Sequence, residues 1–176
     1  MFGKRGIGVA LSSLALLGAS VVTAQGARAH EGPIGCTGQE NTSYTPGLSL
    51  TQRPTAVVAN GAYTCTGAPG RTVAATTRIE ATSPSTGCVH LGVLRAEETV
   101  RYGDGRTSVI SYTTGRSTRA LGLNTVRLEG VVVKGLGRGG RAERVIQTAP
   151  AGLPTECLTP GGLREVTAFV QLRILP

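Results

Sequence analysis

The sequence predicts an all-β fold: an antiparallel β-sandwich, immunoglobulin-like in its general architecture, with a closed β-barrel as the alternative. Runs in which apolar and polar residues alternate recur along the chain, and this two-residue period is that of a half-buried strand. Turn-forming residues such as Gly, Pro and Asn separate these runs. No run shows the 3.6-residue period of a convincing helix. Seven or eight strands of this kind can pack as two facing sheets or close on themselves.

Residues 1–29 are typical of a secretory signal peptide. Lys4-Arg5 gives the segment a positive start, and an apolar stretch rich in small residues follows over 7–22. The motif Ala27-Arg28-Ala29 offers a cleavage site, and Ala24 offers a second one. An uncleaved membrane anchor is the alternative, but the small residues and the cleavage motif weigh against it.

Cleavage after Ala29 leaves residues 30–176, a length that fits one domain with a core of moderate size. A secreted chain enters an oxidising compartment, where disulfides form and persist. We therefore expect a soluble, extracellular protein without a membrane span, consisting of a single disulfide-bonded β domain.

The runs expected to form strands are, in chain order, 42–50, 55–65, 71–82, 88–98, the two arms of a hairpin within 97–112, then 124–134, 142–147 and 164–175. Pro54 suits the entry of the second run, because proline is tolerated at a strand start and not in its middle. Thr and Val residues favour a strand over 71–82. Gly92 weakens a helix over 88–98, where apolar residues alternate.

The hairpin within 97–112 is centred on Asp104-Gly105, a dipeptide that favours a two-residue type I′ turn. Such a turn fixes the register of the two arms. It predicts the cross-strand pairs Tyr102 with Thr107, Arg101 with Ser108 and Val100 with Val109.

The last three strands are predicted from the same kinds of signal, namely turn residues and alternation. Four glycines within residues 135–140 predict a flexible tip between 124–134 and 142–147. The run 164–175 alternates most clearly, so one of its faces should meet the core. That face consists of Val166, Ala168, Val170, Leu172 and Ile174.

The four cysteines predict two disulfides, for which three pairings exist. Cys36 and Cys65 stand almost symmetrically about a turn near Thr51, so an antiparallel hairpin would place them side by side. Apposed residues meet the short Cα separation that a disulfide requires. This pairing leaves Cys88 with Cys157. No two cysteines have the close spacing of a zinc site.

Few groups are available to form an active site. His30 lies at the mature N-terminus, His90 lies within an apolar alternation, and Asp104 is explained as a turn residue. Glu97 and Glu98 are adjacent, so on a strand they face opposite sides and cannot flank one bond. We therefore assign no catalytic, cofactor-binding or metal-binding residue and expect no enzyme.

The positive charge is dispersed. Residues 30–176 hold 15 basic and 10 acidic residues, a net charge of +5. Arg138, Arg141 and Arg144, in and beside the glycine-rich tip, are the candidates for binding an anionic partner, because guanidinium groups pair bidentately with phosphate and carboxylate. A cell-wall polymer or another acidic polymer fits this charge, whereas too few aromatic residues accompany it for nucleic-acid bases to stack. Arginines that merely solubilise the tip are the alternative.

Several short motifs resemble those of small secreted Thr- and Gly-rich proteins of actinobacteria such as streptomycetes. They are Ser43–Leu48 (SYTPGL), Gln52–Pro54 (QRP), Tyr63–Cys65 (YTC) and Cys157–Leu163 (CLTPGGL). The resemblance spans nearly the whole mature chain. Because its motifs are turns and cysteines, it implies a compartment and a fold and no activity.

The leading functional interpretation is a secreted, non-enzymatic protein that acts through extracellular or cell-surface interactions. A binding module for acidic polymers or carbohydrate is one alternative, although the chain has few aromatic residues on which sugars could stack. A secreted hydrolase or a protease inhibitor is another, with the loop Thr155-Glu156-Cys157-Leu158 as the candidate inhibitory segment.

Overall fold

The computed structural model describes residues 32–66, 71–91, 95–120, 123–148 and 155–176. The expected signal peptide and His30 lie outside these residues. The elements are β1 (Ile34–Leu48), β2 (Arg53–Thr66), β3 (Thr72–Gly87), β4 (His90–Leu91), β5 (Arg95–Tyr102), β6 (Thr107–Ala120), β7 (Leu123–Gly135), β8 (Arg141–Thr148), the short 3₁₀ helix η1 (Thr155–Leu158) and β9 (Leu163–Leu175). Among the described residues no helix is long and apolar enough to cross a membrane.

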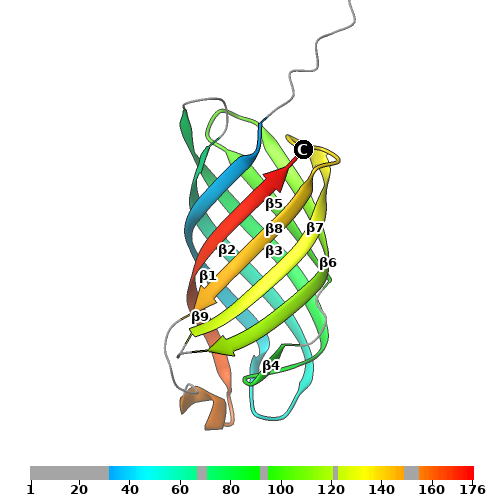
Figure 1. Ribbon diagram of the computed structural model, residues 1–176. Coiled ribbons are helices and arrows are strands. Elements are labelled where there is room, and N and C mark those ends of the chain that lie inside the picture. Colours follow the sequence, from blue (N-terminus) through cyan, green and yellow to red (C-terminus); the bar gives the residue numbers. More distant parts are fainter. Residues whose placement is uncertain (1–31, 67–70, 92–94, 121–122, 149–154) are drawn as a thin grey trace, which may run out of the picture.

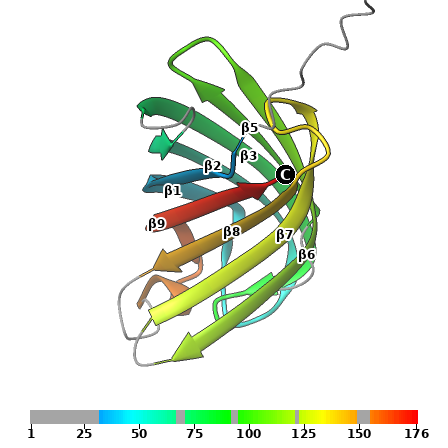
Figure 2. The same cartoon turned by 45° about the horizontal axis from the view of Figure 1, so that its top comes forward.

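The long strands form one antiparallel sheet that closes into an eight-stranded barrel (Figure 1). Each strand pairs with the next in the chain, β3 pairing with β5 across the two-residue β4. The circle closes because β9 pairs with β1. Figure 2, with one end turned forward, shows the strands curving around a common interior. The predicted β-sandwich is therefore wrong and the alternative, a closed barrel, is confirmed.

Burial alternates along most strands, so every second side chain points into the barrel. On β9 the face predicted to meet the core does so, with Leu172 and Val170 fully buried and their neighbours exposed. One continuous strand over 88–98 is wrong. The chain turns at residues 88–89, forms β4, and begins β5 at Arg95.

The β5–β6 hairpin turns at Asp104-Gly105 as predicted, but its register differs by one residue. Arg101 lies opposite Thr107, because three residues rather than two form the loop between Tyr102 and Arg106. Gly105 adopts φ +88° and its N–H donates to the Tyr102 carbonyl at 2.9 Å. This is the alternative hairpin loop in which a turn is followed by one left-handed residue.

Both predicted disulfides are present. Cys36 lies directly opposite Cys65 in the β1–β2 ladder, with 4.0 Å between their Cα atoms. Cys88, just after β3, is bonded to Cys157 in η1, with 6.2 Å between their Cα atoms. The first disulfide lies near the end of the barrel that holds the starts of β1 and β3 and the end of β9. The second lies at the opposite end and joins two connections there.

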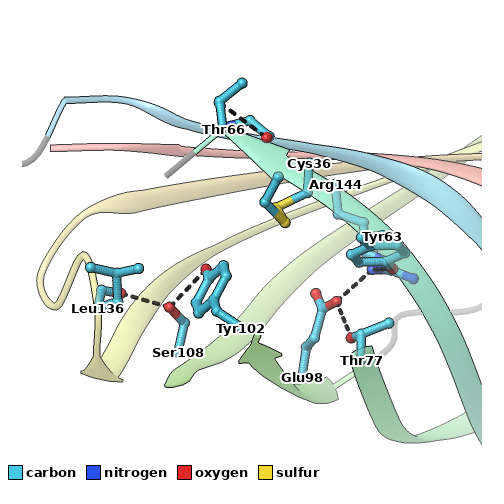
Figure 3. Close-up of a disulfide and its surroundings, with 11 residues drawn as sticks. Cys36, Tyr63, Thr66, Thr77, Glu98, Tyr102, Ser108, Leu136 and Arg144 are labelled. Carbon is cyan, nitrogen blue, oxygen red and sulfur yellow. Dashed lines mark hydrogen bonds and ion pairs between the residues drawn. A yellow bond between two sulfur atoms is a disulfide. The ribbon is translucent and has the colours of Figure 1, made fainter. Parts of the chain in front are cut away.

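The glycine-rich tip between β7 and β8, predicted to be flexible, is folded against the barrel end. Leu136 is buried there, and its N–H donates to the Thr107 carbonyl at 2.8 Å. The Ser108 hydroxyl donates to the Leu136 carbonyl at 2.7 Å and is also 3.0 Å from the Tyr102 hydroxyl (Figure 3). Apolar side chains fill the interior beneath this turn, including Ile34, Val100, Ile110, Val132, Leu172 and Ile174. This end of the barrel is therefore packed.

Candidate functional site

A buried arginine occupies the middle of the barrel. Arg144 is 0% exposed, because β8 alternates and Arg144 shares the inward face with Ala142. A buried guanidinium is costly unless its donors are paired. The partners of Arg144 therefore show how the interior compensates this charge.

The guanidinium of Arg144 is paired with two carboxylates, one from β1 and one from β5. Its Nη1 donates to Glu98 Oε1 at 2.7 Å and to the Tyr63 hydroxyl at 2.5 Å, and its Nη2 donates to Glu40 Oε2. Its charge also lies 5.8 Å from the centre of the Tyr63 ring. Figure 3 shows Arg144, Tyr63 and Glu98 converging from β8, β2 and β5. One cation on β8 thus contacts side chains from β1, β2 and β5.

Both carboxylate oxygens of Glu98 accept hydrogen bonds. Besides Arg144, its Oε1 accepts from the Thr77 hydroxyl at 2.5 Å, and its Oε2 accepts from the Tyr112 hydroxyl at 2.5 Å. Burial, together with the adjacent Glu98 charge, raises the pKa of Tyr112 well above its ordinary value, so Tyr112 stays a donor. Glu98 is therefore a structural partner of Arg144, held in place by three hydrogen bonds.

Glu40 is the less satisfied carboxyl. Its Oε2 accepts from Arg144, but its Oε1 has only a long 3.5 Å contact with the Thr42 hydroxyl. The side chain is nonetheless buried, with 3% of the residue exposed. Burial raises the pKa of Glu40, and the Glu98 charge raises it further, against the lowering effect of Arg144. Glu40 therefore keeps an unfilled acceptor inside the barrel.

Missing side chains at two glycines make room for this cluster. Gly38 lies opposite Tyr63 in the β1–β2 ladder, and a Cβ atom there would lie 2.6 Å from Tyr63 Cδ1. A Cβ atom at Gly61 would lie 2.9 Å from Thr77 Cγ2. Because real Cβ atoms do not approach so closely, any larger residue at either position would displace a partner of Arg144 or Glu98.

On the other side of Glu40 the interior is hollow. A cavity of about 400 Å³ extends from Glu40 towards the end of the barrel that holds the Cys88–Cys157 disulfide. Its walls are mostly apolar side chains from several strands, among them Val57, Ala59, Ile79, Ala81, Val126 and Ala168. Val89 and His90, which are exposed, also line it at that end, so the cavity reaches the surface. One end of the barrel is thus packed and the other holds a pocket.

Tyr44 adds a second polar group to this pocket. It lines the cavity from β1, and its hydroxyl has no hydrogen-bond partner among the described residues. Burial raises the pKa of Tyr44, and the charge of Glu40 raises it further. The phenol is therefore neutral and free to hydrogen-bond a bound molecule close to Glu40.

The arginines predicted to bind an anionic partner do not lie together. Arg138 and Arg141 are exposed on the outside, and Arg141 is 3.4 Å from Glu129. Arg144 lies inside the barrel and is already paired with two carboxylates. The prediction that Arg144 belongs to a surface site is wrong. Side chains alternate between the two faces of β8, so Arg141 points outward and Arg144 points inward. Anion binding by Arg138 and Arg141 stays a prediction.

The other groups considered from the sequence are placed as follows. Glu97 is exposed and Glu98 is buried, so the two do point to opposite faces. Asp104 bonds the backbone and side chain of Arg106 at the packed end, as expected of a turn residue. His90 lines the pocket at the other end. Asp104 and His90 therefore cannot act together.

Sequence reasoning missed Glu40, because it began the first strand at Thr42. The alternation of side chains between the two faces of a strand could have revealed it. Cys36 was expected to face its partner in a hairpin, and Glu40 follows it by four residues, so in one strand both lie on the same face. A carboxyl on the face that meets the core would have marked the interior as charged.

A second hollow, of about 760 Å³, lies on the outside of the barrel over β2, β3, β5 and β6. Outward residues such as Ala56, Glu80 and Glu97 line it. These side chains are exposed to solvent, so a ligand bound there would have to compete with water. The interior pocket, with its buried carboxyl, is the stronger candidate site.

Comparison of the chain with protein-family models, with curated proteins and with solved structures gave no match. The resemblance to secreted actinobacterial proteins therefore stays a prediction.

Proposed function

We propose that this protein is a secreted, non-enzymatic binding protein that holds a small, mostly apolar molecule inside its barrel. The observation that carries the proposal is the cavity of about 400 Å³ whose apolar walls end at the buried Glu40 carboxyl. Pockets for small molecules typically have volumes of roughly 300–1,000 Å³ and combine apolar walls with a few polar groups. Both properties are met in one place.

The architecture supports this use of the interior. An eight-stranded barrel can either be filled by its side chains or hold one small ligand. Here large inward residues fill one half, whereas small ones such as Ala59, Ala81 and Ala168 line the other. The apolar walls would exclude water from a hydrocarbon body, and Glu40 and Tyr44 would orient its polar group.

Secretion remains part of the proposal. Two disulfides and the signal-like segment 1–29 support it, since disulfides persist in oxidising compartments. A diffusing carrier or scavenger of small molecules is one role that such a protein would fill outside the cell.

Filling the pocket tests the proposal. The neutral dye N-phenyl-1-naphthylamine, which brightens in apolar surroundings, should bind the wild-type protein with increased fluorescence. Replacing Ala59, whose side chain lines the cavity, by Phe should weaken binding at least tenfold. The matched control is Ala62→Phe, on the outward face of the same strand, which should bind as the wild type does. A wild-type protein that leaves the dye dark, or equal binding by both variants, would overturn the proposal.

A further inference from the structure

The charges around the pocket do not balance. Two carboxyl groups, Glu40 and Glu98, share the single guanidinium of Arg144, and all three side chains are at most 1% exposed. With all three ionised the interior carries one excess negative charge, which is costly away from water. Something positive must compensate it, and in the empty pocket a proton on Glu40 can do so.

An anionic ligand finds no free cation beside Glu40. The Nη1 and Nη2 atoms of Arg144 already donate to Glu98, Tyr63 and Glu40. The Nε of Arg144 has no partner among the described residues, but Arg144 is not among the residues that line the cavity. An incoming carboxylate or phosphate would instead meet the Glu40 carboxyl and add a negative charge to an interior that already has one guanidinium for two carboxyl groups. Such a charge is costly in a site shielded from water.

A cationic ligand finds a prepared partner. Glu40 lines the cavity, and its Oε1 holds only the 3.5 Å contact with Thr42, so it can accept a further hydrogen bond. The Tyr44 hydroxyl, which also lines the cavity, supplies a second acceptor. An ammonium group offers three donors and the missing positive charge, and would replace the proton that Glu40 otherwise holds.

Building on the binding function proposed above, we infer that the natural ligand is an amine: a small molecule with an apolar body and one ammonium group, which pairs with Glu40. The apolar walls take the body, and the excess carboxyl takes the charge. The pocket selects against acids of the same size because they add a negative charge, and it prefers the amine to an alcohol because an alcohol offers no positive charge to pair with the Glu40 carboxylate.

Three probes with one hydrocarbon body test the inference: octylamine, octanol and octanoate, titrated at pH 7 into the disulfide-bonded protein and followed by NMR. Octylamine, protonated at this pH, should bind at least tenfold more tightly than octanol, and octanoate should bind most weakly. Glu40→Gln should bring octylamine to the affinity of octanol while octanol binding stays unchanged. Glu97→Gln, which removes the same charge from the outer face, should keep the wild-type order.

The outcomes separate the inference from the proposed function. If octanol binds as tightly as octylamine, or if Glu40→Gln keeps the preference for the amine, the amine inference is overturned and the binding pocket stands. If none of the three probes binds, both are overturned. The comparison of probes on the wild-type protein decides the matter even if Glu40→Gln fails to fold.

Discussion

At the scale of single residues, the main feature of the molecule is a charged cluster that is buried inside the barrel. Arg144 joins Glu40 and Glu98, while the Tyr63 hydroxyl accepts from Arg144 and the Tyr112 hydroxyl donates to Glu98. A buried ion pair of this kind contributes little net stability but is costly to break, by about 3–5 kcal/mol when one partner is removed. The cluster therefore adds little to the free energy of unfolding. Its main effect is to specify which strands come together.

Glu40 should give the protein a distinctive dependence on pH. Burial raises its pKa above the ordinary value of 4.5, so the folded state holds the proton more tightly than the unfolded state does. This contribution to stability is full below pH 4.5 and is lost as pH rises through the folded-state pKa. The loss is roughly 1.4 kcal/mol for each unit by which the pKa is raised.

Glu40→Gln should remove this dependence. Urea unfolding of the wild type and the variant between pH 4 and pH 8 should show the wild type losing stability relative to the variant as pH rises. Glu97→Gln, on the outer face, serves as the control and should follow the wild-type curve. Parallel curves for the wild type and Glu40→Gln would show that the carboxyl titrates normally.

At the scale of the elements, local sequence signals predicted where strands and turns lie along the chain better than they predicted which residues pair between strands. The β1–β2 register was predicted correctly, because two cysteines symmetric about a turn permit one alignment. The β5–β6 register was wrong by one residue, because Asp104-Gly105 fits both a two-residue and a three-residue loop. The start of β1 at Ile34 was missed, since the glycine and polar residues before Thr42 hide its alternation.

The three-residue loop predicts a specific cost at Gly105. This glycine has φ +88° and open space around the position of a Cβ atom, so Gly105→Ala adds backbone strain without a clash. The loss of stability should be about 1–2 kcal/mol. Gly32 also has open space and lacks a positive φ, so Gly32→Ala should cost almost nothing. Urea unfolding midpoints measure both, and equal midpoints would contradict the loop geometry.

At the scale of the whole molecule, closure was the step that sequence could not decide. The β1–β9 pairing joins Ile34 to Ile174, which are near the two ends of the described chain, and no local pattern links such distant segments. Sandwiches and barrels both use alternating strands, so the same pattern predicts either. The pocket could not be predicted from the sequence for the same reason. It exists because Glu40, Tyr44 and Ala168 meet across strands whose neighbours were unknown.

The two disulfides should differ in their effect on the pocket, because they lie at opposite ends of the barrel. Replacing Cys88 and Cys157 by Ser removes the link at the open end, and replacing Cys36 and Cys65 removes the one at the packed end. On the loop-entropy model the double variants lose about 4.4 and 3.6 kcal/mol of stability, respectively.

Dye binding distinguishes the two ends. The Cys88 and Cys157 variant should bind N-phenyl-1-naphthylamine more weakly, because Cys88 lines the pocket. The Cys36 and Cys65 variant should retain its affinity wherever it is folded. If the second variant lost affinity and the first kept it, the pocket would have been placed at the wrong end.

The closed circle of strands also limits how other proteins can approach. Each of the eight long strands is hydrogen-bonded to a neighbour on both sides, with β9 against β1 completing the ring. Exposed strand edges are the templates on which foreign strands add and on which aggregates grow. Along most of the wall of this barrel no such template is offered by the described strands, the exception being the part of β6 beyond Tyr112, which pairs only with β7. A protein partner would therefore have to recognise that edge, outward side chains or the loops at the two ends.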